Sequence, residues 1–354
     1  MVSSKFNKTI ELFKKAGEDG VFPGGCLSIG DRSGEILRCC TGYKSLYPTR
    51  EVLNEDTLFD MASLTKILST TMVTLRFLEE GLLSLQDNLG FFFNNCTKDK
   101  EEITILNLMT HTSGLKGSIP LYTLVSNEKE AIDEILRSDL AIPPNTDTIY
   151  SCLGFILLGR ILEIVGNNTL DKLSEEYVFN PLEMYNTGFN PRNFNIASTE
   201  YSEDIQEYLK GIVHDENARF LKGISGNAGV FSNLNDMNKF AQMLSNEGGY
   251  KGKQFLGENT FNNSIYNFTK GKSEHRGLGF SLKDNRIHPA GDLFSLGSYG
   301  HTGFTGTSLW IDKETGMYTV LLTNRVHPTR DNIRLIRFRR LLHNAVITEY
   351  KGGY

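Results

Sequence analysis

The pattern of apolar and polar residues predicts strands near both ends of the chain and helices between them. Residues 25–30 and 35–42 are typical of short strands and are separated by a polar, turn-forming tetrapeptide, so they predict a β-hairpin. Residues 307–311 and 317–323 flank a second polar turn and predict another hairpin. The two hairpins therefore stand at opposite ends of the sequence.

Helical periodicity dominates the middle of the chain, where apolar residues recur at every third or fourth position. Threonine and glycine mark several ends of these segments, as expected of helix caps. The helices predicted there are residues 64–80, Ile105–Met109, Glu128–Arg137 and 153–165. Further helices are expected around Ile10, Leu12 and Phe13, at residues 237–244 after a cap formed by Asn233 and Asp236, and at residues 331–345.

This order of elements predicts an α/β (α+β) fold with one antiparallel sheet assembled from both termini. Helices flank the sheet, and the mostly helical middle section is an insertion between its two halves. The sequence shows no internal repeat or low-complexity segment that would indicate a repeat architecture.

Composition narrows the classes of function. The 354 residues are 39% hydrophobic and 22% charged, which is enough apolar material for a large core. The net charge of −5 gives no general attraction to nucleic acid or anionic lipid, so a small-molecule or peptide substrate is favoured over nucleic acid. The most apolar segment, residues 155–165, is interrupted by Gly159, Arg160 and Glu163, so we expect no membrane-spanning helix. The oligomeric state stays open.

The N-terminus lacks the uninterrupted apolar stretch of a secretory signal. The chain as written is therefore expected in the cytoplasm, or outside it if a signal peptide was removed.

The cysteines and several absent motifs argue against metal and cofactor chemistry. Five cysteines, an odd number without CxxC spacing, indicate neither a disulfide framework nor a zinc site, so reduced structural thiols are expected. HExxH and GxSxG motifs are absent, and Gly271-Lys272-Ser273 lacks the upstream glycine of a phosphate loop. We expect no metal and no organic cofactor.

A serine followed by a lysine three residues later is the first chemical signal. Ser63 stands where a loop enters a predicted helix, and Lys66 follows on the same helical face, so the two side chains can touch. A lysine activates a serine hydroxyl as a base only if its own pKa is lowered by burial, the helix dipole or a second cation. The helix start would also present the Ser63 amide to a developing oxyanion. Ser-x-x-Lys alone is also common in ordinary helices.

Two further motifs favour a catalytic role for this pair over an ordinary helix. Tyr150-Ser151-Cys152 precedes a helix, and His301-Thr302-Gly303 precedes a strand. Two longer motifs accompany them, Leu108–Leu115 and Gly226–Ser232. Together these motifs resemble those of the serine β-lactamase and penicillin-binding-protein superfamily, in its class C β-lactamase, DD-peptidase and esterase branch. The resemblance covers nearly the whole chain. It implies a sheet domain of residues 1–60 and 221–354, a mostly helical domain of residues 61–220, and an active site at their junction.

The resemblance also implies roles. Ser63 would be the acylated nucleophile, Lys66 its proton partner and Tyr150 the phenol that shuttles protons. His301 holds a position often taken by lysine, where the family binds a substrate carboxylate or assists proton movement. The amides of Ser63 and Phe304 would form the oxyanion hole.

Cys152, Thr302 and Gly303 would lie beside the substrate in such a site. Cys152 replaces the asparagine with which the family usually binds the substrate's acylamide. A neutral imidazole at position 301 is a poorer carboxylate anchor than an ammonium. We expect His301 at the edge of the cleft, with its charge rising as pH falls through its usual range near 6.5. Peptidase or esterase action is therefore favoured over potent β-lactamase action.

The leading hypothesis is a serine hydrolase that acts through an acyl-enzyme on amide or ester carbonyls. The alternative is a penicillin-binding or cell-wall-sensing module with little or no turnover, for which Cys152 is the hint. His111 is predicted to be structural, and His214-Asp215-Glu216-Asn217 is predicted to be loop structure. The arginines of the C-terminal helix are predicted to form a solvated face: Arg334, Arg337, Arg339 and Arg340.

Overall fold

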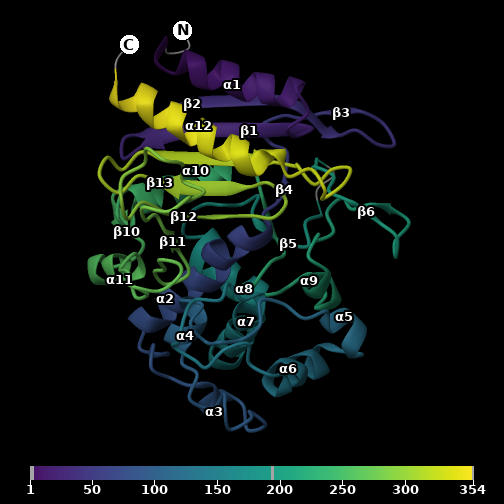
Figure 1. Ribbon diagram of the computed structural model, residues 1–354, viewed down its shortest axis with the longest axis vertical. Coiled ribbons are helices and arrows are strands. Elements are labelled where there is room, and N and C mark those ends of the chain that lie inside the picture. Colours follow the sequence, from purple (N-terminus) through teal and green to yellow (C-terminus); the bar gives the residue numbers. More distant parts are fainter. Residues whose placement is uncertain (1–3, 193–194, 353–354) are drawn as a thin grey trace.

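The computed structural model describes residues 4–192 and 195–352 (Figure 1). A seven-stranded antiparallel sheet has the strand order β11-β12-β13-β14-β1-β2-β3. The strands are β1 Gly24–Asp31, β2 Gly34–Ser45, β3 Glu51–Val52, β11 Ser281–Leu282, β12 Tyr299–Thr302, β13 Ser308–Ile311 and β14 Tyr318–Thr323. Because β1 pairs with both β2 and β14, the sheet joins the two ends of the chain, as predicted.

Helices cover both faces of this sheet. Figure 1 shows α1 and α12 side by side on one face and α10 on the other. The larger helices are α1 Asn7–Glu18, α2 Thr71–Glu79, α6 Glu128–Arg137, α7 Cys152–Gly166, α10 Leu234–Ser245 and α12 Arg334–Lys351. Shorter helices are η1 Ser4–Phe6, η2 Ala62–Leu64, η3 Lys66–Thr70, α3 Leu89–Phe92, α4 Ile105–Met109, α5 Leu121–Leu124, α8 Leu170–Ser174, η4 Glu175–Phe179, α9 Glu216–Phe220 and α11 Glu258–Ser264.

Three small sheets complete the fold. One, in the order β4-β8-β5, places the strand that precedes Ser63 in the middle of the molecule. The small-sheet strands are β4 Phe59–Asp60, β5 Gly188–Phe189, β6 Tyr201–Ser202, β7 Glu207–Tyr208, β8 Val230–Ser232, β9 Gly249–Tyr250 and β10 Lys253–Gln254.

The main hydrophobic core runs from the sheet through α10 into the helices around α7, and a second cluster fills the space between the sheet and the α1–α12 pair. Burial of this apolar surface is the dominant stabilising term of the fold. The division into domains at residues 60 and 221 stays a prediction.

The predicted hairpins and most predicted helices are confirmed, including the Thr104 cap of α4 and the Asn233 cap of α10. The continuous helix expected over residues 64–80 is wrong in detail. The chain forms the 3₁₀ turn η2, the π-helical turn η3 and then α2. π-helical turns are rare in proteins overall, and those that occur are often at functional sites.

Within the described parts of the chain, no single helix is long and apolar enough to span a membrane. Cys152–Gly166 and Leu170–Phe179 pass that test only as a pair, bent by 80°.

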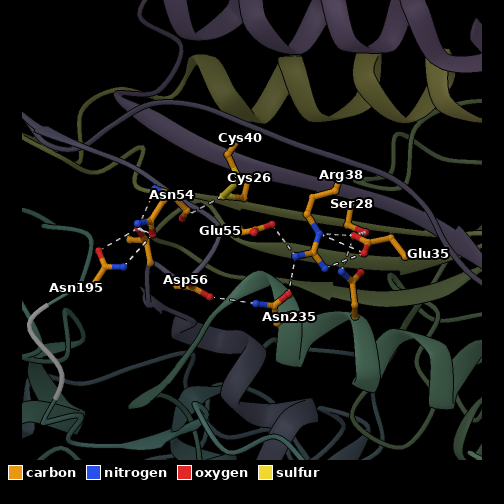
Figure 2. Close-up of a disulfide and its surroundings, with 12 residues drawn as sticks. Cys26, Ser28, Glu35, Arg38, Cys40, Asn54, Glu55, Asp56, Asn195 and Asn235 are labelled. Atoms are coloured by element: carbon orange, nitrogen blue, oxygen red, sulfur yellow. Dashed lines mark hydrogen bonds and ion pairs between the residues drawn. A yellow bond between two sulfur atoms is a disulfide. The ribbon is translucent and has the colours of Figure 1, made fainter. Parts of the chain in front are cut away.

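The prediction that all five cysteines are reduced is wrong for two of them. Cys26 and Cys40 face each other across β1 and β2, with Cα atoms 4.2 Å apart, and form a disulfide (Figure 2). An odd cysteine count excludes a full framework of pairs but not one bridge between register partners. Cys39, Cys96 and Cys152 are free thiols.

Five of the seven histidines have a lowered pKa, chiefly because burial disfavours the charged imidazole. The pKa of His288 falls to about 4 and that of His343 to about 3. Those of His111 and His301 lie well below the usual value, and that of His327 is also lowered.

These histidines predict acid destabilisation at mild pH. The unfolded chain takes up protons near pH 6.5 while the folded chain does not, so stability is lost as pH falls below about 6.5. Each fully buried histidine contributes about 1.4 kcal/mol per pH unit in that range. We expect the thermal midpoint to drop between pH 7 and pH 5, above the range in which carboxylates titrate. A midpoint that is flat over this interval would contradict the buried, neutral imidazoles.

Candidate active site

The nucleophile candidate lies in a short turn between a strand and a helix. β4 ends at Asp60, η2 carries Ser63, and Lys66 begins η3. The Nζ of Lys66 lies 3.1 Å from the Oγ of Ser63, so the predicted contact is present. Ser63 stands in the first turn of η2, where backbone amides lack helical acceptors.

Lys66 is fully buried and has an acceptor for each of its three ammonium protons. Besides Ser63, its Nζ donates to the carbonyl of Asn227 at 3.0 Å and to the Sγ of Cys152 at 3.5 Å. Burial by itself lowers the pKa of Lys66, but its interactions with Cys152 and Tyr150 outweigh burial and raise that pKa. The condition under which Lys66 could act as the base, a lowered pKa, is therefore not met, and Lys66 is an ammonium at neutral pH.

Tyr150 lies at the entrance of α7, just before Ser151, whose hydroxyl accepts from the amide of Gly154 and caps the helix. Two cations face its ring. The Nζ of Lys66 is 5.0 Å and the Cζ of Arg276 is 5.4 Å from the ring centroid. Cations at these distances are attracted to the electron-rich face of the ring. Arg276 was not identified from the sequence.

His111 packs against the other side of this tyrosine, with ring centroids 4.7 Å apart. Its Nδ1 accepts from the amide of Ser151 at 3.1 Å, and the side chain is buried. This fixes the loop that carries Tyr150, which supports the predicted structural role.

His301 differs from its predicted setting. It is only 3% exposed, and its Nδ1–H donates to the carbonyl of Thr302 at 2.8 Å. Burial first, and then the charges of Arg276 and Lys66, lower its pKa well below the usual value. His301 lines the cavity, but the expectation that its imidazole is exposed and gains charge near pH 6.5 is wrong.

The neutral His301 ring lies beside Tyr150, with centroids 5.8 Å apart. Its Nε2 is buried and has no partner among the described residues. With the proton on Nδ1, this Nε2 is a free acceptor.

The strand edge next to Ser63 is shaped by close backbone approach. A Cβ at Gly303 would lie 2.6 Å from the carbonyl oxygen of Met61 and 2.1 Å from the Oγ1 of Thr307, so only glycine fits. Gly303 donates to Thr307, and Phe304 follows at the tip of the turn. No acceptor for the Phe304 amide is found within the described residues. The turn therefore brings that amide next to the nucleophile strand with its hydrogen free.

A cavity of about 690 Å³ connects these groups. Ser63, Tyr150, His301, Thr302, Gly303 and Phe304 line one part, and Trp310, Arg325, Ile336 and Arg339 line another. The cavity therefore extends from the nucleophile past the open end of β12 to the C-terminal helix.

Two arginines mark the far part of this cavity. Arg339 is buried, contrary to the predicted solvated face, because its position on α12 turns inward toward the sheet. Its Nη2 reaches the carbonyl of Thr307 at 3.5 Å, and its Nε has no partner among the described residues. Burial and the nearby Arg325 lower its pKa to about 10. Within the described part of the chain, Arg325 itself donates to the carbonyls of Arg330 and Asn332 and to no carboxylate.

The structure thus gathers Ser63, Lys66, Tyr150 and His301 as predicted, with Cys152 beside Lys66 and Thr302 and Gly303 lining the cavity. Sequence reasoning missed Arg276, the Asn227 carbonyl and the inward Arg339. Asn227 lay within a motif already matched to the family, whereas no sequence signal distinguished the buried Arg276 from the exposed arginines. Among the described residues, no group of three or more His, Cys, Asp or Glu side chains could hold a metal ion.

Comparison with known proteins settles the family. The family profile described as "Beta-lactamase" matches residues 9–344. The chain belongs to the β-lactamase family. A protein of Escherichia coli (strain K12) named D-alanyl-D-alanine carboxypeptidase is 33% identical over 307 residues, which cover 77% of this chain and 70% of that protein. An N-acetylmuramyl-L-alanine amidase of Bacillus subtilis (strain 168) is 28% identical over 86% of this chain and 78% of its own length.

Solved structures show the same fold. EstCE1, described as a hydrolase with promiscuous acyltransferase activity, superposes with a TM-score of 0.78 at 20% identity over 97% of this chain and 98% of its own. Simvastatin synthase (LovD) of Aspergillus terreus superposes with a TM-score of 0.76 at 19% identity over 99% and 100%. This β-lactamase family member is a serine hydrolase, as the sequence motifs predicted.

Proposed function

We propose that this enzyme hydrolyses amide or ester carbonyls through an acyl-enzyme formed on Ser63. The observation that carries the proposal is the 3.1 Å contact between the Lys66 Nζ and the Ser63 Oγ at the wall of a large cavity. A serine becomes a useful nucleophile only when a neighbouring group receives its proton.

Tyr150 is the proposed proton acceptor, because Lys66 already carries its full complement of protons. Tyr150 must begin this step as the phenolate: as the Ser63 Oγ bonds to the carbonyl carbon, the Ser63 proton passes to the phenolate oxygen. That proton then moves to the leaving nitrogen or oxygen as the scissile bond breaks. In deacylation a water molecule gives one proton to Tyr150 as its oxygen bonds to the acyl carbon, and the Ser63 Oγ–acyl bond then breaks as Tyr150 returns that proton to the Ser63 Oγ. Lys66 and Arg276 stabilise the negative charge on the tyrosine in each half-reaction.

His301 is proposed to orient Tyr150 rather than to bind a carboxylate. Its free Nε2 can accept a hydrogen bond only, and a neutral ring offers no charge to an anion. The amides of Ser63 and Phe304 are the proposed oxyanion donors. Such donors commonly contribute factors on the order of 10²–10³ to the rate.

Arg325 and Arg339 favour a substrate that carries a carboxylate beyond the scissile bond. A buried guanidinium without an acidic partner is costly, and a substrate anion would offset that cost. The carboxypeptidase name of the E. coli relative fits this chemistry. We therefore propose that peptides ending in a free carboxylate are better substrates than neutral esters.

Replacing Arg339 by methionine tests the substrate class, since methionine keeps an apolar stem of similar length. We expect kcat/KM for a D-alanyl peptide with a free C-terminal carboxylate to fall about tenfold or more, as charged hydrogen bonds contribute about 1.5–3 kcal/mol. The value for the same peptide as a C-terminal amide should stay within about twofold. Arg337→Met, on the exposed face of the same helix, is the matched control. Equal losses on both peptides would contradict the carboxylate role.

A penicillin-binding module with little turnover is the second candidate, favoured by Cys152. Its thiol touches Lys66 where the family usually has an asparagine that holds the acylamide. Intact mass after exposure to a penicillin and to an activated short-chain ester separates the two functions. A hydrolase releases the ester's acyl group within the assay, whereas a sensing module keeps the added mass.

A further inference from the structure

His214 links two parts of the site that come from distant segments of the chain. It lies between β7 and α9 and is 4% exposed. Its neighbour Asp215 caps α9 through the amide of Ala218, so that part of the segment is loop structure as predicted. His214 itself makes contacts that a loop role does not require.

The backbone of His214 holds the nucleophile turn. Its amide donates to the Oδ2 of Asp60 at 2.7 Å, and the Oδ1 of the same carboxylate accepts from the amide of Ala62 at 2.8 Å. Ala62 has a φ of 45°, a left-handed conformation that is strained for alanine. Asp60 thus fixes this strained residue directly before Ser63.

The imidazole of His214 holds the opposite wall. It stacks on the Phe304 ring, with centroids 5.6 Å apart and an interplanar angle of 26°. Phe304 is 51% exposed, so few other groups restrain it. The Cζ of Arg325 lies 4.7 Å from the same ring centroid.

Glu200 fixes the His214 imidazole in turn. The Nε2 of His214 lies 3.1 Å from the Oε2 of Glu200, and the other oxygen of that carboxylate accepts from the amide of Arg330 at 2.8 Å. Arg330 also pairs with Glu216 at 2.7 Å. The ring therefore cannot swing away from Phe304 without breaking this network.

We propose that His214 is a positioning residue that sets the separation between the two oxyanion amides, Ser63 through Asp60 and Phe304 through ring stacking. The inference rests on the proposed function and adds a residue outside its three motifs. Oxyanion donors act only within about 2.7–3.1 Å of the developing charge, and small misplacements reduce the rate strongly.

Two other bonds keep the turn folded when His214 is changed. The Oγ1 of Thr305 donates to the carbonyl of Asp60 at 2.7 Å, and the Oγ1 of Thr307 donates to the carbonyl of Met61 at 3.1 Å. Loss of the imidazole should therefore loosen the alignment of the amides without opening the site.

The experiment compares His214→Ala, Phe304→Ala and the double variant on an activated ester, with a phenylboronic acid as a probe of the tetrahedral adduct on Ser63. His214→Ala should lower kcat ten- to a hundredfold while KM changes less than about threefold. Boronate affinity should fall by the same factor as kcat/KM, since both report binding of the tetrahedral state. The His214 ring acts through Phe304. The kcat of the double variant should therefore be at most about twofold lower than the kcat of the less active single variant.

His214→Gln, which can still bond Glu200 but has no ring, tests the same point if the alanine variant is unstable, and the same losses are expected. His214→Phe should recover most of the lost kcat. His343→Ala is the matched control, because His343 is a buried histidine of α12 whose Nδ1 bonds the carbonyl of Pro289, outside the network that holds His214, so stability should fall with little change in kcat for the ester.

Unchanged boronate affinity in both the alanine and glutamine variants, or losses that multiply in the double variant, would overturn the positioning role alone. A wild-type enzyme that neither acylates nor binds the boronate would overturn the proposed function and this inference with it.

Discussion

Replacing Ser63 by alanine is expected to abolish hydrolysis and covalent labelling while leaving the protein folded. The expected loss in kcat is on the order of 10⁴-fold or more, as for other serine nucleophiles. Among the described residues the Ser63 hydroxyl bonds to Lys66 alone, and a hydrogen bond to a charged group contributes about 1.5–3 kcal/mol. Steady-state kinetics on an activated ester and a thermal melt measure the two effects separately.

Ser174→Ala is the matched control for this variant. Ser174 is buried, and its variant loses a 2.6 Å hydroxyl contact with Ser69, but it lies in α8 and does not line the cavity. It should lose some stability and keep its activity. An Ser63→Ala protein that turns over the ester at the parent rate would show that the nucleophile has been assigned to the wrong residue.

Tyr150→Phe and Lys66→Ala are expected to slow acylation by roughly 10²–10⁴-fold each, because both act on the proton that leaves Ser63. The double variant should lose far less than the product of the two single losses, since the lysine works through the tyrosine. Single-turnover acylation followed by quenched mass spectrometry measures this step without product release.

Tyr299→Phe and Lys100→Ala separate chemistry from burial. Tyr299 is a buried tyrosine whose hydroxyl donates to the carbonyl of Leu244 at 2.9 Å, and Lys100 is a buried lysine bonded to Thr97 and Asp99. Both should lower the melting temperature and leave acylation intact. Losses that multiply in the Lys66–Tyr150 double variant would argue against a shared proton route.

Many helices and strands of the fold could be predicted from the local sequence. Helix ends such as Thr104 and Asn233 depend on bonds to amides two or three residues away, so they can be identified from the sequence alone. The joining of β1 to β14 followed from strand patterns at both ends of the chain. The π-helical turn after Ser63 was not predicted, because its apolar and polar pattern does not differ from that of an ordinary helical turn.

The site was predictable where residues are linked by short spacing or by family motifs. Ser63 and Lys66 meet because they are three residues apart on one helical turn, and His301 and Gly303 were identified through their resemblance to a known family. The Cys26–Cys40 bridge depends on strand register, which the cysteine count does not contain.

Electrostatics was the least predictable property. The charge of His301 depends on its burial and on Arg276, which approaches from a loop distant in sequence. The same holds for Lys66, whose pKa follows from what surrounds it in the folded core. Arg339 faces inward only because α12 packs on the sheet at a particular rotation.

The acyl-enzyme on Ser63 can be trapped and located directly. The enzyme is mixed with an activated ester, quenched with acid during the first turnovers, digested and analysed by mass spectrometry. We expect one added acyl group on the peptide that contains Ser63, and we expect this group to disappear once the ester is consumed. The Ser63→Ala protein should carry no acyl group. An acyl group on another residue, or turnover without any acylated peptide, would contradict the acyl-enzyme on Ser63.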